Sequence, residues 1–429
     1  MIYSKLKKIL IVVIVLLAFQ NLSAQTGISS PYSRFGIGHL ERKSVNARLL
    51  GMGGIANAVS SNRFVNPTNP ATYSGFDSLS FLFDAGFNMN RVVFKTTAKS
   101  EMGTNATLSY FSLGFPVVKW WHSAIGVLPY SQVGYNVVIP FENEQIGKYN
   151  KAFEGEGGLN QAFIGNALTL GKHFSVGANI TYVFGNNSAS SLVYFPDSSL
   201  YANTRAVSKT LANDFIFDYG VLYKKAFSDN YSLNVGLVYN QKINLNVKRD
   251  FLLKSMFGGV DGEIEYVLDT IFYTPSENGV IVLPHKLGLG AVFEKKNSWL
   301  IGFDANWQNW KNFSAFGVND SLINAWNVAF GGEYTPNFTS ISGYWKRVTY
   351  RAGFRYDQTY LKINGQPINE YAFSVGMGLP LPRTMTTVDL SVELGRTGTT
   401  SHDLIQENFV NFTVGVSLYE RWFVKRKYD

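Results

Sequence analysis

Long runs of alternating apolar and polar residues constrain this chain more than any other feature. The clearest run covers residues 232–248, where polar residues and glycine occupy most of the intervening positions. A period of two is typical of a β-strand whose two faces have different surroundings. The run predicts one strand face toward lipid or a core, formed by Leu233, Val235, Leu237, Tyr239, Ile243, Leu245 and Val247.

The same alternation recurs along the chain, for example at residues 388–395 and 410–418. Strands of soluble sandwiches alternate too, but they usually run about 5 to 6 residues, whereas tilted membrane strands need roughly 9 to 11. These runs are long, which favours a membrane barrel. We count about fourteen, centred near residues 86, 112, 130, 165, 180, 216, 238, 288, 304, 328, 353, 375, 391 and 413.

The connections between the runs also fit a barrel. Predicted short turns at residues 120–123, 171–174, 227–231, 295–298 and 380–384 alternate with longer segments, notably 140–157 and 249–280. Bacterial outer-membrane barrels have an even strand number, short periplasmic turns and longer outer loops. We therefore predict an all-β fold, a 14-stranded antiparallel transmembrane outer-membrane β-barrel. Tryptophans near strand ends predict an aromatic girdle, formed by Trp120, Trp121, Trp299, Trp310, Trp345 and Trp422.

The first residues predict export from the cytoplasm. Lys5, Lys7 and Lys8 precede an apolar stretch at residues 9–19, and Ala24 is a small residue suited to signal cleavage. That stretch is too short to span a bilayer. We predict a signal peptide at residues 1–24 and a location in the outer membrane of a Gram-negative cell.

Composition and motifs argue against several other classes. Aromatic residues make up 15% and charged residues 16% of the chain, which does not fit disorder. The formal charge of +8 includes three signal-peptide lysines, and the remaining +5 is too small to indicate nucleic-acid binding. There is no cysteine, and the histidines have no metal-ligand spacing. We expect no enzyme activity, no catalytic residues, no metal and no cofactor.

Residues 25–77 show neither helical nor strand periodicity, which predicts a plug, or hatch. We predict the barrel at residues 78–419 and a basic periplasmic tail at residues 420–429. Residues 30–38 are rich in turn formers, and 41–50 could form a short helix. Glycines let a backbone lie close to a wall, and Asn before Pro favours a turn. The candidate hatch residues are Gly51, Gly53, Gly54, Asn66, Pro67, Asn69, Pro70 and Ala71. The alternative is that they form turns only.

The small-residue run at 51–56 and the Asn69-Pro70-Ala71 step resemble the FadL-like long-chain fatty acid transport family of outer-membrane barrels. The resemblance implies fourteen strands, an N-terminal hatch in the lumen and uptake of hydrophobic compounds. The preceding Asn66-Pro67-Thr68 step is an addition to the family pattern. Residues 30–38 do not match the best-known members either.

The resemblance also implies a kinked third strand that opens the wall sideways. Pro129 lies on the predicted third strand, and a proline removes a donor from a strand ladder. We predict a lateral opening at Pro129; a plain bulge is the alternative, and Pro116 is the competing position.

The implied function is an outer-membrane channel for hydrophobic small molecules such as long-chain fatty acids, with lateral release through the wall. The alternative is a non-transporting FadL-like structural subunit of a larger outer-membrane secretion or assembly complex. Two features support that alternative: residues 30–38, which do not match the family, and the predicted outer loop at 249–280. Expected partners are outer-membrane lipid, a hydrophobic ligand and other proteins of such a complex, but no nucleic acid.

Overall fold

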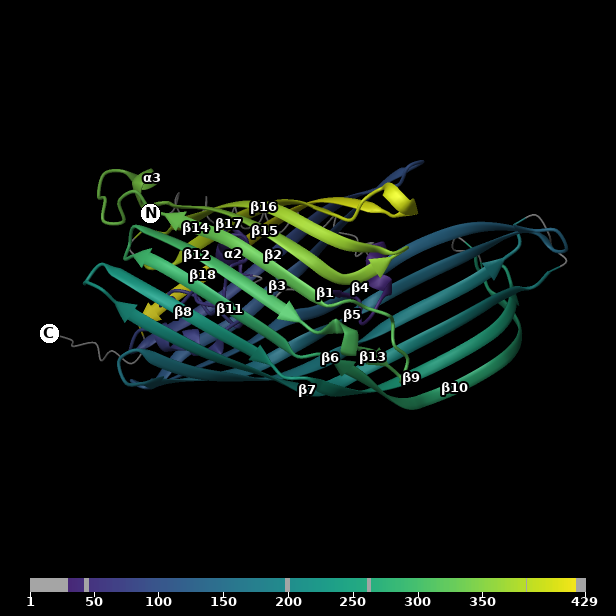
Figure 1. The fold of residues 1–429 in the computed structure, drawn as a ribbon, viewed down its shortest axis with the longest axis horizontal. Coiled ribbons are helices and arrows are strands. Elements are labelled where there is room, and N and C mark those ends of the chain that lie inside the picture. The colour runs from purple at the N-terminus through teal and green to yellow at the C-terminus, as the bar shows by residue number, and fades with distance from the viewer. Residues whose placement is uncertain (1–29, 42–45, 197–200, 261–263, 383, 422–429) are drawn as a thin grey trace, which may run out of the picture.

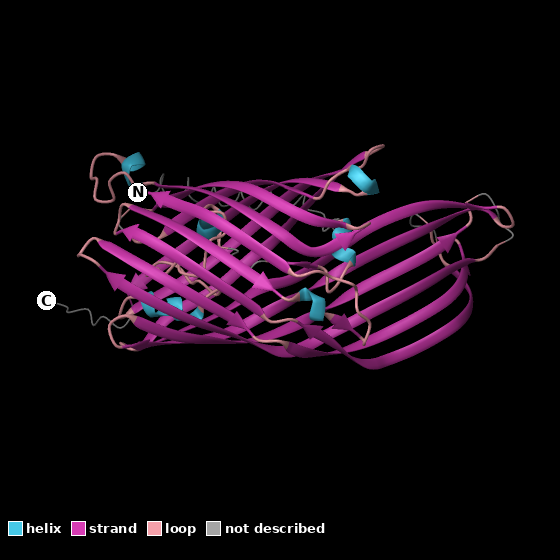
Figure 2. Ribbon diagram, viewed as in Figure 1, coloured by secondary structure: helices cyan, strands magenta, loops and turns pink. Residues whose placement is uncertain are grey.

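The computed structural model describes residues 30–41, 46–196, 201–260, 264–382 and 384–421, which form a closed antiparallel β-barrel (Figures 1 and 2). Two wall strands are interrupted, one consisting of β8 with β9 and the other of β10 with β11. The wall therefore has fourteen strands, and every predicted strand centre lies within one of them. They are β2 (Ser80–Lys95), β3 (Ser100–Val118), β4 (Trp121–Asn143), β5 (Gly147–Leu170), β6 (Phe174–Tyr194), β7 (Asn203–Ala226), β8 (Tyr231–Asn240), β9 (Ile243–Phe257), β10 (Tyr266–Leu283), β11 (Lys286–Lys295), β12 (Trp299–Gln308), β14 (Ala325–Tyr334), β15 (Thr349–Ile363), β16 (Gln366–Pro380), β17 (Thr387–Thr397) and β18 (Gln406–Arg421).

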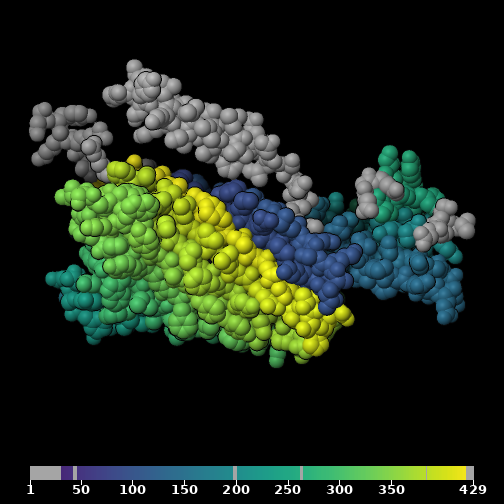
Figure 3. Space-filling model, turned by 90° about the horizontal axis from the view of Figure 1, so that it is seen from above, coloured from purple at the N-terminus to yellow at the C-terminus, as the bar shows by residue number. Residues whose placement is uncertain are grey.

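The last strand closes the barrel against the first. β18 pairs with β2 along its whole length, from Gln406 opposite Lys95 to Arg421 opposite Ser80. Figure 3 shows this seam, with the C-terminal strand in yellow lying beside the first wall strands in blue. Closure satisfies the backbone groups of both strands, which a strand edge in lipid could not do.

The predicted alternation of faces is present at the seam. On β17, Asp389, Ser391 and Glu393 are buried toward the lumen. On β18, Val410 and Phe412 are exposed on the outer surface. Apolar residues outside and polar residues inside are the pattern of a membrane barrel. Among the described residues, no helix combines the length and apolar character needed to cross a bilayer.

The single apolar face predicted for residues 232–248 is wrong beyond residue 240. Leu237 and Tyr239 are exposed, as expected, but Leu245 and Val247 are buried. The wall strand breaks between β8 and β9, and the break reverses the face that the apolar residues occupy. The first half of the apolar face meets the outer surface, and the second half meets a core inside the barrel.

The predicted long loops at 140–157 and 249–280 are also wrong, because most of these residues continue the strands. β4 extends to Asn143 and β5 begins at Gly147, while β9 extends to Phe257 and β10 begins at Tyr266. Together with the ends of β6 and β7, these extensions form a lobe that projects beyond the remaining strands (Figure 1). Alternation requires one apolar and one polar surrounding, so a strand exposed on both faces gives no such sequence signal. We call this the lobe end, and the opposite end the short-turn end.

Short elements complete the structure: η1 (Pro31–Arg34), β1 (His39–Leu40), α2 (Ala47–Leu50), η2 (Pro70–Gly75), η3 (Trp310–Asn312), β13 (Ser314–Ala315), α3 (Tyr344–Arg347) and η4 (Ser401–Asp403). The expected short helix at 41–50 is present in part as α2. Trp310 does not join a girdle, because it is buried in the core. The predicted signal peptide, Trp422 and nearly all of the predicted tail lie outside the described residues.

Candidate functional site

Residues 46–76, which we call the inner segment, lie against the inner wall with glycines on both sides of the contact. Gly53 has a φ of +71° and donates from its backbone N–H to the Ser374 hydroxyl at 2.8 Å. A Cβ on Gly353 of the wall would overlap the Gly53 backbone, and one on Gly331 would overlap Met52. Backbone therefore lies directly on backbone, an approach that only residues without a side chain permit. Gly51 ends α2, and Gly54 also has a positive φ.

The two Asn-Pro steps organise the turns of the inner segment. Asn66 donates to the carbonyls of Ala56 and Val59 at 2.7 and 2.9 Å. Asn69 caps η2 by accepting from the Ala71 N–H at 3.0 Å, and Pro70 is the first residue of η2. Such side-chain bonds satisfy buried backbone groups that have no partner in a helix or sheet.

The same steps also contact the wall. Asn179 donates to the Pro67 carbonyl at 3.0 Å, and Asn69 donates to the Val221 carbonyl at 3.3 Å. A Cβ on the wall glycine Gly177 would lie only 2.5 Å from the backbone nitrogen of Ala71. The predicted hatch residues are thus brought together inside the barrel; their role in transport stays a prediction.

Charged wall residues hold the inner segment at further points. Asp304 Oδ2 accepts from the backbone N–H groups of Ala56 and Asn57 at 2.6 and 2.8 Å. Arg48 forms a two-point contact with Glu333, at 2.5 and 3.1 Å. Charge-assisted and two-point bonds of this kind are stronger than neutral ones.

The inner segment also contacts the short-turn end through Arg63. The Arg63 guanidinium lies 4.6 Å from the centre of the Phe338 ring, which belongs to the connection between β14 and β15. Burial, followed by the nearby Arg48 charge, lowers the pKa of Arg63 from its usual value. This contact joins the inner segment to a turn that lies outside the wall strands.

Residues 30–41, which we call the outer segment, pack at the lobe end of the lumen. Tyr32 and Ile37 belong to an apolar cluster that includes Trp310, Phe313 and Leu361 of the barrel. The Ser30 hydroxyl donates to Glu407 at 2.5 Å, and the Tyr32 hydroxyl donates to the Ile405 carbonyl. Burial, with Glu407 as the second cause, raises the pKa of Tyr32 above its usual value. The outer segment and the apolar cluster therefore cover the inner segment from the lobe end.

The wall is interrupted between its second and third strands. The β3–β4 ladder stops at Phe111 opposite Val127, whereas β4 continues to pair with β5 as far as Asn143. Pro129 lies just beyond the end of that ladder, at a register shift between Pro129 and Ser131. Gln161 donates to the Pro129 carbonyl at 3.0 Å. The third-strand proline thus coincides with the place where the two strands separate.

The outer segment pairs with the edge that β3 leaves open. β1 pairs with β4, with His39 opposite Gln132 and Leu40 opposite Ser131. The Ser30 N–H donates to the Gly134 carbonyl at 3.1 Å. One side-chain bond also crosses the gap, from Asn105 of β3 to Gln132 at 3.3 Å. The outer segment therefore satisfies part of the β4 edge that β3 leaves open, between Tyr130 and Gly134.

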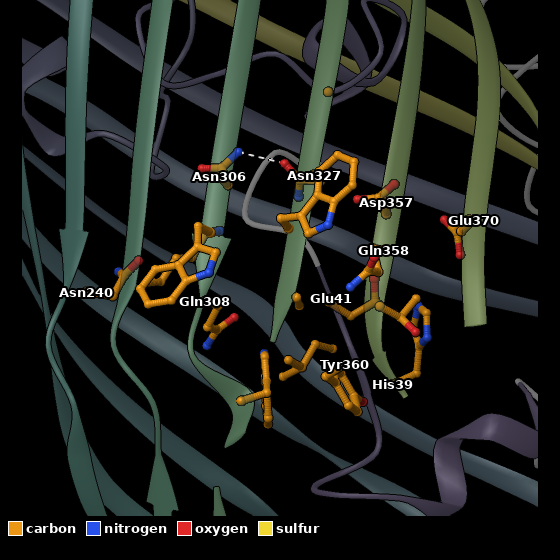
Figure 4. Close-up of a pocket in the computed structure, with 18 of the residues that line it drawn as sticks. His39, Glu41, Asn240, Asn306, Gln308, Asn327, Asp357, Gln358, Tyr360 and Glu370 are labelled. Atoms are coloured by element: carbon orange, nitrogen blue, oxygen red, sulfur yellow. Dashed lines mark hydrogen bonds between the residues drawn. The ribbon is translucent and has the colours of Figure 1, made fainter. Parts of the chain in front are cut away.

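A chamber of about 280 Å³ lies between the two segments (Figure 4). Amide side chains form one part of its lining: Asn57 donates to Asn306 at 3.1 Å, and Asn306 donates to Asn327 at 2.9 Å. Tyr360 also lines it and stacks on Trp310, with ring centres 4.3 Å apart. The charged lining residues are Glu41, Asp218, Asp304, Asp357, Glu370, Glu407, Lys286 and Arg355. No group of three or more His, Cys, Asp or Glu in the described part of the chain could hold a metal ion.

Sequence reasoning missed the chamber and the role of the outer segment. Of the predicted hatch residues, only Gly53 and Gly54 line the chamber. The turn-rich stretch at 30–38 was the available signal for the outer segment, but turn residues do not reveal which strand edge they will meet.

A family model described as BamG matches residues 5–429. The chain belongs to the BamG family. No match was found among the curated proteins. The BamG-family barrel has the FadL-type fold, which solved structures of low sequence identity share.

Three such structures are the toluene transporter TbuX of Ralstonia pickettii, the toluene transporter TodX of Pseudomonas putida and a FadL homologue of Pseudomonas aeruginosa. TbuX is 13% identical with a TM-score of 0.59, and 87% of this chain aligns with 97% of that chain. TodX is 16% identical with a TM-score of 0.57, covering 90% and 100% of the two chains. The FadL homologue is 13% identical with a TM-score of 0.57, covering 88% and 98%. These likenesses establish the fold alone.

Proposed function

We propose that this BamG-family barrel resides in the outer membrane and transports hydrophobic small molecules, releasing them sideways through the gap beside Pro129. The observation that carries the proposal is the interrupted β3–β4 ladder, which ends at Phe111 and Val127. Lateral release has an energetic reason: each buried methylene contributes about 0.8 kcal/mol, so a chain of about sixteen carbons would lose about 12 kcal/mol on entering water. Passage through the wall into lipid avoids this cost.

The chamber lining favours some cargo over others. Carboxylates outnumber basic groups among its charged residues, and Arg355 is shared between Asp357 and Glu370. An ionised fatty acid would meet like charges there, which opposes its entry. Within the proposed class we therefore expect neutral hydrophobic compounds to pass more readily than ionised long-chain fatty acids.

The test is uptake into liposomes that contain the purified protein, with one labelled fatty acid and one labelled neutral aromatic hydrocarbon. Pro129→Ala restores a backbone donor at the register shift, which favours a regular strand beside the gap, so we expect uptake to fall several-fold. Pro116→Ala is the matched control, because Pro116 lies in the paired part of the β3–β4 ladder, opposite His122 and next to another register shift. Transport is rejected if the unaltered protein takes up no more than empty liposomes. Lateral release is rejected if Pro129→Ala has no effect.

The second candidate function is a structural subunit of a larger outer-membrane complex, and the lobe favours it. Val267, Ile271, Phe272 and Tyr273 on β10 are each more than half exposed, at 53%, 53%, 54% and 56%. Apolar residues grouped on a surface outside the membrane are typical of a protein interface.

Purification from mildly solubilised membranes discriminates between the two functions. A stoichiometric complex that is lost when Val267, Ile271 and Phe272 are changed to Ser supports the subunit. Thr270→Ser with Thr274→Ser, on the same strand, is the control and should keep the complex. A lone barrel with co-purified lipid supports transport instead.

A further inference from the structure

Basic side chains recur around the short-turn end of the barrel. They lie on or next to the turns after β3, β5, β7, β11 and β14, and at the end of β18. We call this set the basic rim: Lys119, Lys172, Lys224, Lys225, Lys295, Lys296, Lys346, Arg347 and Arg421. Acidic residues at the same end are fewer: Asp77, Asp229, Glu294, Glu420 and Glu333, the last of which pairs with Arg48 and Arg351 in the lumen. At the lobe end, basic and acidic residues are mixed.

Aromatic rings lie at the same level as the basic rim. Trp120 and Trp121 stack beside Lys119, and Phe174 follows Lys172 after one residue. Lys225 lies 5.5 Å from the centre of the Phe227 ring, and Lys295 lies 5.6 Å from that of Tyr231. Aromatic residues of a membrane protein gather at the headgroup level, so the basic groups beside them reach the same layer.

We propose that the basic rim binds the phosphates of anionic phospholipids, holding a ring of these lipids around the short-turn end. The distribution of the basic residues around the barrel favours lipid headgroups, and not an acidic protein, as the binding partner. Successive turns are neighbours around a barrel, so the rim extends along most of the circumference. A protein partner covers one arc of a surface, whereas headgroups surround the whole barrel. This inference is independent of whether the barrel transports anything.

The experiment compares spin-labelled phosphatidylglycerol with spin-labelled phosphatidylcholine in bilayers that contain the purified mature protein. A single basic residue near the surface favours an anionic headgroup about five-fold. We expect the immobilised lipid at the protein boundary to be enriched in phosphatidylglycerol by several-fold at low salt, and less so at high salt because exposed charges are screened.

Two matched variants locate the effect. Lys119→Gln, Lys172→Gln, Lys296→Gln and Lys346→Gln together remove one charge from each of four turns and should lower the preference clearly, although five basic residues of the rim remain. Lys95→Gln, Lys99→Gln, Lys311→Gln and Lys362→Gln remove the same charge at the lobe end and should leave it unchanged. A heat-dependent gel shift confirms that both variants are folded. The proposal is overturned if the rim variant keeps the preference, which is the result expected if the rim binds an acidic protein. It is also overturned if the lobe-end variant loses the preference equally.

Discussion

At the scale of single residues, the inner segment is held by backbone placed against wall glycines and by wall carboxylates that accept backbone N–H groups. Gly331 and Gly353 leave room for Met52 and Gly53, and Asp304 accepts from two adjacent N–H groups. The sequence predicted the glycines of the segment but not the wall glycines that match them. Glycine is frequent throughout this chain, with 40 residues, so its spacing does not identify which pairs meet.

Gly353→Ala tests the close approach. The new methyl group would overlap the Gly53 backbone, so we expect a loss of about 1–3 kcal/mol in the free energy of unfolding, measured by urea denaturation in detergent. Gly302→Ala is the control, because its methyl group would meet the flexible end of the Ile55 side chain at 2.7 Å. Equal stability of the two variants would contradict direct backbone packing.

Asp304 gives a second test at this scale. Asp304→Ala leaves the N–H groups of Ala56 and Asn57 without their acceptor, at a cost of about 1–3 kcal/mol for each buried group. We expect faster amide hydrogen exchange at these two residues. Asp304→Asn retains one acceptor oxygen and should exchange more slowly than Asp304→Ala. Unchanged exchange in Asp304→Ala would show that the wall carboxylate does not hold the segment.

At the scale of elements, the outer segment acts as a substitute strand beside β4. It supplies backbone partners at Gln132 and Gly134, where β3 has separated from β4. If cargo leaves through this gap, the outer segment has to move, because it occupies the open edge.

A cysteine pair tests that movement. Leu40 and Ser131 are direct partners in the β1–β4 pairing, which suits the geometry of a disulfide, and the chain contains no other cysteine. In Leu40→Cys with Ser131→Cys, we expect oxidation to reduce uptake to the level of empty liposomes and a reductant to restore it. Full uptake by the oxidised pair would mean that the segment stays in place during transport. Each single variant serves as a control.

The wall strands could be predicted because lipid outside and water inside impose alternation, as on β17 and β18. The alternation no longer predicts the faces correctly where the strand does not have lipid on one side and water on the other. On β9 the apolar residues Leu245 and Val247 turn inward, and on the lobe β10 is exposed on both faces from Tyr266 to Tyr273. Pro129 was found because a proline in a strand is unusual, whereas the chamber amides Asn306 and Asn327 look like any polar lumen residues.

At the scale of the whole molecule, the barrel encloses two stacked segments of its own chain with a polar chamber between them. The ladder between β18 and β2 makes the wall continuous at the seam. The gap between β3 and β4 is filled in part by the outer segment.

A closed wall predicts a heat-dependent gel shift. In detergent without boiling, the compact barrel should migrate faster than the boiled chain, because closed ladders resist the detergent until heated. Removing the β9–β10 part of the lobe by joining Asp250 to Thr274 through a short turn should leave the shift intact, since the ladders of the other strands remain. A protein that stays in solution without detergent would contradict the membrane barrel.

The seam also sets an order of assembly. The inner segment connects directly to the start of β2, while the outer segment lies at the opposite mouth, so the N-terminal part of the chain runs through the lumen from one end to the other. A pre-formed cylinder would have to be threaded by this stretch, whereas an open, curved sheet can wrap around it. The pairing of β18 with β2 is therefore the step of assembly after which the two segments are enclosed in the lumen.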